Sequence, residues 1–279
     1  MRWFAGALAA AGGVALAGAA AAAPAVEINH AIARVIISPE PRADIKVDVL
    51  RSNPRLPLRV WSFLGRTYID GGLAAGRLRS CHGTVAQPSV YAVGIGEVSA
   101  DTMPQIVIRT PMDARVSAGG AVFGQVGRSA TLELSNAGCG DWQVGNVRGK
   151  MKVNVAGSGS VRTGQAGSAE LMAAGSGEIA THDIAGPVVA MNFGSGDIEV
   201  ASVQGPFNAR IAGSGHVTAA GGHASAMQAS IAGSGDIALN GVADSLNASV
   251  MGSGDVRVLR VTGSVRKAIV GSGDVRIGS

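Results

Sequence analysis

The residues best suited to chemistry in this sequence are acidic side chains that recur at a fixed spacing. The tripeptide Gly-Ser-Gly occurs seven times between residues 157 and 273, in steps of 18 to 20 residues. The residue that follows it is acidic in five copies, namely Glu178, Asp197, Asp236, Asp255 and Asp274. Stacked carboxylates are ligands that Ca²⁺ prefers, so Asp236, Asp255 and Asp274 are weak Ca²⁺ candidates. Structurally, each Asp would accept backbone N–H bonds at its own corner; we favour this interpretation because Ser160 and His216 interrupt the series.

Two arginines follow the last acidic residues. Arg257 and Arg276 lie two positions after Asp255 and Asp274, and a guanidinium can hold a carboxylate in a bidentate pair. If the repeats stack, these side chains could grip an acidic sugar. Glu199 occupies the same position of an earlier repeat. Arg257, Arg276 and Glu199 therefore form a candidate ligand surface, and the alternative is a solvated row of charges.

Catalytic and cofactor chemistry finds little support in the sequence. His30, His82, His182 and His223 share no phase of the repeat, so a zinc cluster is not indicated. The third glycine of a phosphate-binding loop is missing after every Gly-Ser-Gly. We therefore predict no enzyme, no catalytic residue and no cofactor. The net charge is only +4, and the basic residues are scattered singly, so nucleic-acid binding is not predicted either.

The start of the chain has the pattern of a secretory signal peptide. Met1 and Arg2 precede an uncharged apolar run from Trp3 to Ala22, and Ala23-Pro24-Ala25 gives a small-x-small cleavage site. Ala and Gly dominate the run, so residues 1–25 are interpreted as a cleaved signal rather than a membrane anchor. We expect an exported protein, periplasmic, secreted or at the cell surface, that is not an integral membrane protein.

Two cysteines, Cys81 and Cys139, remain after such a cleavage. An even pair in an exported protein predicts one disulfide. The alternative is two unpaired, buried cysteines, and the sequence alone does not fix their distance.

The glycines identify the elements that must position these side chains. Of 42 glycines, 31 lie in residues 116–279, and the phase of the tripeptide extends back to Gly138 and Gly119. Apolar residues alternate with polar ones after each copy, as in Val161, Ile179, Ile198 and Val217, which is typical of a strand with one buried face. A unit of about 19 residues with two short strands cannot offset the entropy of ordering its own backbone. The sequence therefore predicts an all-β fold, a parallel β-solenoid of nine stacked turns.

The glycine-poor residues 26–115 lack this signature. Strand patterns cover 33–37, 44–50, 58–61 and 105–109, separated by prolines and glycines. We expect an N-terminal β region that forms the cap and first turns, followed by the repetitive solenoid at 116–279. A separate β domain in residues 26–115 is the alternative.

The repeat itself resembles a known family. Copies such as Gly233-Ser234-Gly235-Asp236-Ile237 and residues 252–258 are similar to those of bacterial proteins named putative autotransporter adhesin, head GIN domain. The similarity covers residues 110–279, and residues 28–50 match the family's opening more loosely. It implies a right-handed parallel β-helix in the cell envelope with an adhesive or surface role, and it carries over no catalytic residues.

The leading functional hypothesis is a non-enzymatic, exported interaction module of the cell envelope or surface, adhesin-like, whose ligand is a glycan or a protein. The alternative is a carbohydrate-binding or carbohydrate-processing β-helix. End-to-end self-association is a third expectation, because the last turn, 270–277, shows no polar cap in sequence and would leave a free sheet edge.

Overall fold

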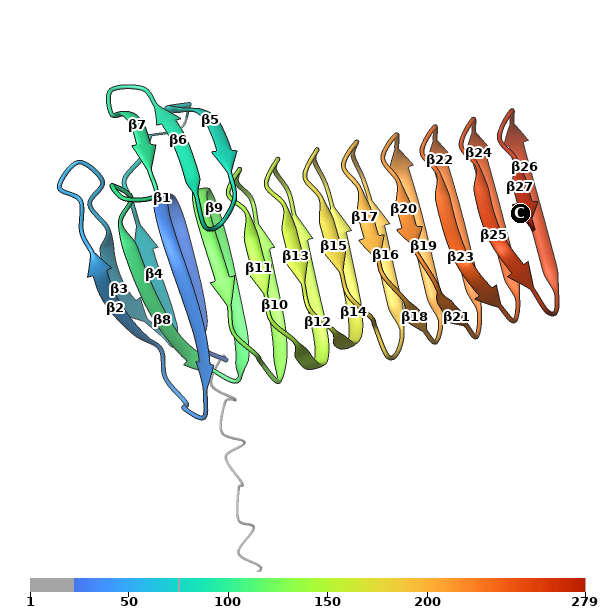
Figure 1. Ribbon diagram of the computed structural model, residues 1–279, viewed down its shortest axis with the longest axis horizontal. Coiled ribbons are helices and arrows are strands. Elements are labelled where there is room, and N and C mark those ends of the chain that lie inside the picture. The colour runs from blue at the N-terminus through green and yellow to red at the C-terminus, as the bar shows by residue number, and fades with distance from the viewer. Residues whose placement is uncertain (1–22, 75, 279) are drawn as a thin grey trace, which may run out of the picture.

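The computed structural model describes residues 23–74 and 76–278, and these residues form strands and connecting turns with no helix. Most of the predicted signal peptide, 1–25, lies outside the described residues. No helix in the described ranges is long and apolar enough to cross a membrane. The predicted parallel β-solenoid is confirmed: the strands stack turn upon turn along one axis (Figure 1).

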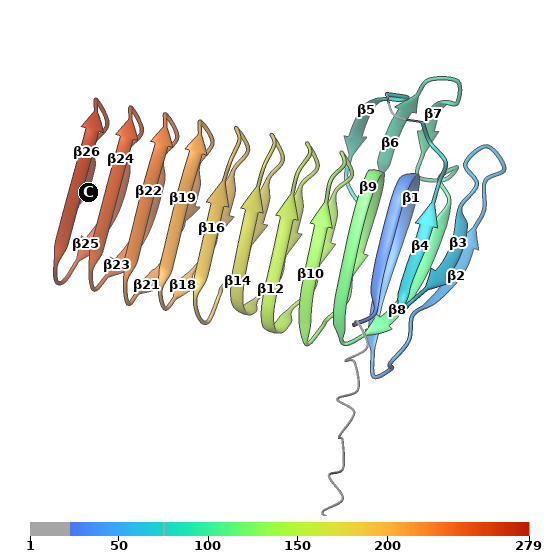
Figure 2. The same ribbon diagram turned by 180° about the vertical axis from the view of Figure 1, so that it is seen from behind.

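Each regular turn consists of one strand that runs toward the Gly-Ser-Gly corner and one that leaves it. We call the stacked strands before the corner the entry sheet, which faces the viewer in Figure 2. Its members are β10 (Thr131–Asn136), β12 (Val147–Val155), β14 (Ala166–Ala173), β16 (Val188–Asn192), β19 (Phe207–Gly213), β22 (Met227–Gly233), β24 (Leu246–Gly252) and β26 (Val265–Gly271).

The strands after the corner form the exit sheet. Its members are β11 (Trp142–Val144), β13 (Val161–Thr163), β15 (Ile179–Thr181), β17 (Ile198–Val200), β20 (Val217–Ala219), β23 (Ile237–Ala243), β25 (Val256–Val261) and β27 (Val275–Ile277). The short strands β18 (Val203–Gln204) and β21 (Gly222–Ala224) lie near the opposite edge. The strand β9 (Asp113–Val126) bends through its corner and completes a ninth turn that contributes to both sheets.

The spacing of the glycines fixes the register between turns. Ile198 lies opposite Val217, and Val217 lies opposite Ile237, in parallel pairs. Because the register repeats, the alternating apolar positions form continuous columns inside the coil. The predicted column is confirmed as core: its members from Val161 to Val256 are 0% exposed. Burying each such side chain contributes about 1.5–3 kcal/mol, which becomes available only when turns stack.

The N-terminal turns are not in sequence order. The strand β1 (Ala25–Glu40) forms one whole turn with its corner at His30, which has a φ of 52°. On one side β1 pairs with β9, and on the other with β4 (Arg66–Asp70) and β8 (Gln105–Pro111). The first strand of the chain is therefore enclosed between strands that follow it by 26 residues or more.

Two antiparallel strands close this end of the coil. β2 (Lys46–Arg51) pairs with β8, and β3 (Arg59–Phe63) pairs with β4. Strands were expected at 33–37, 44–50, 58–61 and 105–109, and these segments overlap β1, β2, β3 and β8. An antiparallel outer strand breaks the parallel register, so further turns cannot simply be added there.

An inserted sheet sits over the corner edge of the first turns (Figure 1). It contains β5 (Leu78–Gly83), β6 (Pro88–Ala92) and β7 (Gly96–Ser99) in antiparallel order. The predicted Cys81–Cys139 disulfide is confirmed, and it joins β5 to a corner of the solenoid. A second core packs beneath the sheet, where Val90, Met103 and Phe123 are buried.

Removing the disulfide is expected to loosen the insert while the coil persists. The bond closes a loop of 58 residues, for which the chain-entropy model gives a stabilisation of about 4 kcal/mol. The double variant Cys81→Ser/Cys139→Ser should therefore lose about 2–4 kcal/mol. Limited proteolysis should show new cleavage within residues 78–99 before any cut in the solenoid; simultaneous cleavage throughout would contradict this prediction.

The last strand of the entry sheet, β26, carries a charged residue at a position of the repeat that faces the core in earlier turns. Lys267 follows Ala248 in a column that is apolar in the earlier turns, and its Nζ donates to the Val275 carbonyl at 2.5 Å. The sequence-based expectation of an end without a polar cap missed this residue. An inward-pointing lysine on a terminal strand opposes edge-to-edge pairing, so it weakens the argument for end-to-end self-association.

Candidate functional site

The acidic column acts as a series of links between turns. Asp141 accepts the Ser160 N–H at 2.9 Å, and Asp197 accepts the His216 N–H at 2.9 Å. The repeat pattern predicted that each Asp would accept hydrogen bonds at its own corner, but these carboxylates mainly accept the N–H of the next corner. Asp236 accepts from Asp255 at 2.8 Å and Asp255 accepts from Asp274 at 3.0 Å.

The two arginines offset the charge of the last three aspartates. Arg257 contacts Asp255 at 2.8 Å, and Arg276 contacts Asp274 at 3.0 Å. Each guanidinium also approaches the preceding aspartate, at 4.0 Å for Asp236 and 3.7 Å for Asp255. A Ca²⁺ ion at Asp236, Asp255 and Asp274 would have to compete with both arginines. No group of three or more His, Cys, Asp or Glu in the described ranges is placed to hold a metal ion.

Glu199 does not join this cluster. It lies on the same outward row of the exit sheet as Arg257, but Thr218 and Ala238 separate the two by three turns. At a strand spacing of about 4.8 Å, that is beyond direct contact. The three residues predicted as one ligand surface thus divide into an Arg/Asp row and a distant glutamate.

The hydrogen bond from Arg276 lowers the pKa of Asp274 below its usual value, and the Val275 N–H lowers it further. We therefore expect Arg276→Gln to raise this pKa toward 3.8. A carboxyl whose folded pKa is depressed stabilises the fold above its unfolded pKa, and the contribution is lost as pH falls through the folded value. Carboxyl NMR titration of both proteins checks this; an unchanged Asp274 midpoint in the variant would exclude the pairing.

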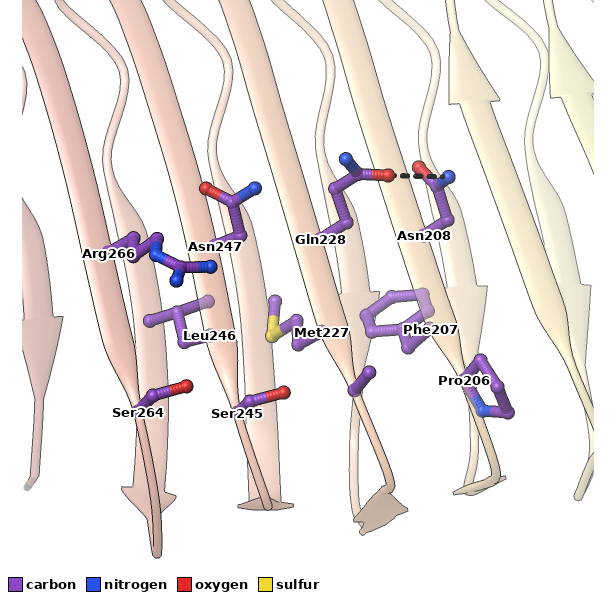
Figure 3. A pocket seen from close by; sticks show the side chains of 11 residues that line it. Pro206, Phe207, Asn208, Met227, Gln228, Ser245, Leu246, Asn247, Ser264 and Arg266 are labelled. Atoms are coloured by element: carbon purple, nitrogen blue, oxygen red, sulfur yellow. Dashed lines mark hydrogen bonds between the residues drawn. The ribbon is translucent and has the colours of Figure 1, made fainter.

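A shallow groove of about 330 Å³ runs along the entry sheet near its edge away from the Gly-Ser-Gly corners (Figure 3). One side carries a row of amides, Asn208, Gln228 and Asn247, which ends at Arg266. The other side carries small residues, among them Ser245 and Ser264. Between these two rows lie Phe207, Met227 and Leu246, whose side chains point into the core and are buried.

The amide row offers donors and acceptors at a regular spacing. Asn208 Nδ2 donates to Gln228 Oε1 at 3.1 Å, while Asn208 Oδ1 is buried and has no hydrogen-bond partner among the described atoms. Because Asn208 Oδ1 is buried, the amide groups that a molecule in the groove could reach are those of Gln228 and Asn247, which are exposed. The row was not predicted from the sequence, although Asn208, Gln228 and Asn247 occupy one column when the repeat copies are aligned.

A histidine and an aspartate meet elsewhere but form no catalytic relay. His223 Nε2 lies 2.8 Å from Asp244 Oδ1, and this hydrogen bond lowers the pKa of Asp244. Thr262 donates its hydroxyl to the same carboxylate at 3.3 Å. A hydroxyl nucleophile would need to bond to the imidazole, so the arrangement fits an exposed structural contact.

The N-terminal end carries a cluster of exposed aromatic side chains. We call β3, β4 and the turn between them the aromatic hairpin. Trp61 and Tyr68 are cross-strand partners whose ring centres are 5.4 Å apart, with 13° between the planes. Phe63 and Leu64 near the tip are 65% and 78% exposed. No pattern in the sequence predicted a role for these residues.

Stacked parallel turns, a glycine corner about every 19 residues and continuous rows of outward side chains define a parallel β-solenoid protein. Residues 169–279 match the family model described as "Putative auto-transporter adhesin, head GIN domain". The match confirms the family resemblance for that part of the chain. No curated protein matches the chain.

Proposed function

We propose that this protein is an exported, non-enzymatic interaction module of the cell envelope or surface, adhesin-like in its use of a rigid coil to present side chains. The observation that carries the proposal is that both sheets present regular rows of outward-pointing side chains. A continuous buried core holds the strands that carry these rows in place. The match to an adhesin-like family over residues 169–279 supports it. The disulfide and the signal-like residues 1–25 support export.

Capture of envelope components tests the proposal. The purified protein, immobilised by one terminus, should retain a saturable ligand from solubilised native envelope, and it should release no products from a panel of polysaccharides. Cleavage of any polysaccharide by an activity that stays with the protein through further purification would overturn the non-enzymatic assignment. Retention of the protein in the cytoplasm after fractionation would overturn export.

A linear glycan in the groove of the entry sheet is the second candidate. The amide row, the serines opposite it and Arg266 can bond hydroxyl groups and one acidic group of a chain laid along the axis. The double variant Gln228→Ala/Asn247→Ala should bind such a glycan at least tenfold more weakly. Ser230→Ala/Ser249→Ala changes the neighbouring outward row of the same strands and serves as the control. Equal affinity of both variants on a glycan array would exclude the groove.

A further inference from the structure

Three arginines that are separated in the sequence come together at the N-terminal end of the coil. The loop between β2 and β3 lies there beside the inserted sheet (Figures 1 and 2), and Asn53 in this loop donates to the Thr102 carbonyl at 2.8 Å. A cavity of about 320 Å³ is lined by Arg55, Arg59 and Arg77, which we call the cavity arginines. Basic residues that are scattered singly along the sequence are therefore gathered around one hollow by the fold.

Two of the cavity arginines reach the same turn, which joins β6 to β7. Arg55 Nη2 donates to the Ile95 carbonyl, and Arg77 Nη2 lies 3.9 Å from the point where a Cβ on Gly94 would be. Arg59 joins them from the base of the aromatic hairpin, where it begins β3. A guanidinium has five N–H donors, so the contact with Ile95 leaves most of those of Arg55 for a ligand.

The charges of the cavity arginines are not balanced by neighbouring acids. None of the three forms an ion pair with an acidic side chain in the described ranges, whereas Arg66, Arg257 and Arg276 each do. A concave surface with one sign of charge concentrates ions of the opposite sign. The cavity is therefore suited to an anion.

The lining also indicates how much charge that anion carries. Asp70 lines the cavity, and its Oδ1 accepts the Gly72 N–H at 3.0 Å and lies 3.5 Å from His30 Nδ1. Three guanidinium groups and this one carboxylate give the lining a net charge of +2. A phosphate monoester carries about −1.5 to −2 at pH 7, whereas the single carboxylate of an acidic sugar carries about −1. Charge balance thus favours the phosphate monoester.

The donors and the floor of the cavity fit the two parts of such a molecule. The backbone N–H groups of Leu73, Arg77 and Ile95 already donate to carbonyls within the protein, so the guanidinium groups supply the donors, and their planar forks match phosphate oxygens. Leu56 and Leu73 lie buried at the floor. Small-molecule sites occupy about 300–1,000 Å³, so this cavity has room for the carbon skeleton that carries the phosphate.

We propose that the cavity arginines bind a phosphate monoester of a sugar or polyol, with its phosphate on the guanidinium groups and its carbon skeleton over Leu56 and Leu73. This site goes beyond the interaction module proposed above, and it depends neither on the groove of the entry sheet nor on the ligand of that groove.

Isothermal titration calorimetry of the whole protein tests the site, with every ligand at the same ionic strength. Glucose 6-phosphate or glycerol 3-phosphate should bind saturably, and inorganic phosphate, glucuronate and glucose should each bind at least fivefold more weakly. Absence of saturable binding by both esters would overturn the proposal. Equally tight binding of inorganic phosphate would overturn it in favour of a site for the free anion, and equally tight binding of glucuronate in favour of a carboxylate.

Two substitutions that remove the same charge assign the binding to the cavity. Arg59 is exposed, and its side chain has no hydrogen bond or ion pair among the described residues, so Arg59→Gln should leave the thermal unfolding midpoint unchanged. It should weaken binding of the ester about tenfold, because it removes a charged hydrogen-bond donor. Arg79→Gln changes β5 outside the cavity lining and should weaken binding less than twofold. Equal weakening by the two variants would overturn the proposal, because the ester would then respond only to the net charge of the protein.

Discussion

Replacing Gly235 with alanine is expected to separate two turns of the solenoid and to cost about 3 kcal/mol of stability. A Cβ at this position would lie 2.1 Å from the Gly215 carbonyl oxygen and 3.0 Å from the side chain of Ile211. The first contact is with backbone of the turn below, which cannot move without breaking the inter-turn hydrogen bonds. The second glycine of the tripeptide is thus required by the close approach of turns.

Hydrogen exchange locates this effect. Because each turn contacts mainly its neighbours, Gly235→Ala should lower protection in the turns after residue 235 more than in those before residue 200. Ser234 is exposed on the same corner, so Ser234→Ala is the matched control and should change stability by less than about 0.5 kcal/mol. Equal loss of protection along the whole coil would show that the turns unfold as one unit.

Truncating Trp142 to alanine is expected to cost about 3–5 kcal/mol. Its side chain is 1% exposed and is among the largest that are fully buried. The ring occupies space that Gly124, its partner on the adjacent strand, leaves open: a Cβ at Gly124 would lie 2.2 Å from two ring atoms. Because protein interiors are close-packed and relax only partly after truncation, we expect a cavity to remain.

Trp142→Phe separates the volume of the ring from its polar atom. The indole Nε1 has no hydrogen-bond partner among the described atoms, and an unmade buried hydrogen bond is itself unfavourable. Removing it should partly offset the lost volume, so Trp142→Phe should cost at most about 2 kcal/mol. Denaturant unfolding of Trp142→Phe and Trp142→Ala checks this prediction. If both variants lose the same free energy of unfolding, the indole nitrogen has a hydrogen-bond partner in solution.

The repeat allowed the solenoid to be predicted because its period is written into the sequence. Gly-Ser-Gly marks the corner, and the residues on either side alternate between core and solvent, so Val161 and Ile198 could be placed without coordinates. The role of Asp255 was harder to predict. Asp255 accepts a hydrogen bond from the Asp274 N–H, and this bond depends on how far one turn is shifted relative to the next. The spacing of the repeats defines which residues are paired, but not the distance between their atoms.

The N-terminal region could not be predicted in the same way. Its strands are recognisable, but the sequence gives no sign that β1 lies between β8 and β9, because no repeat relates those segments. The exposure of Phe63 was missed for a related reason, because it depends on the neighbouring strands rather than on a local motif. The column of Asn208 and Gln228 can be aligned from the repeat, but the groove beside it is recognised only once the turns are stacked.

The place of β1 has a consequence for the order in which the protein can fold. β1 ends at Glu40, and its neighbours in the sheets end at Pro111 and Val126, so 86 residues must follow β1 before both of its edges are fully paired. Bringing such distant segments together is slow, since the loop must close before any contact forms. Once β9 is in place, each later turn needs only the turn before it. Folding should therefore show one slow nucleation step involving residues 25–126, followed by rapid addition of turns toward the C-terminus.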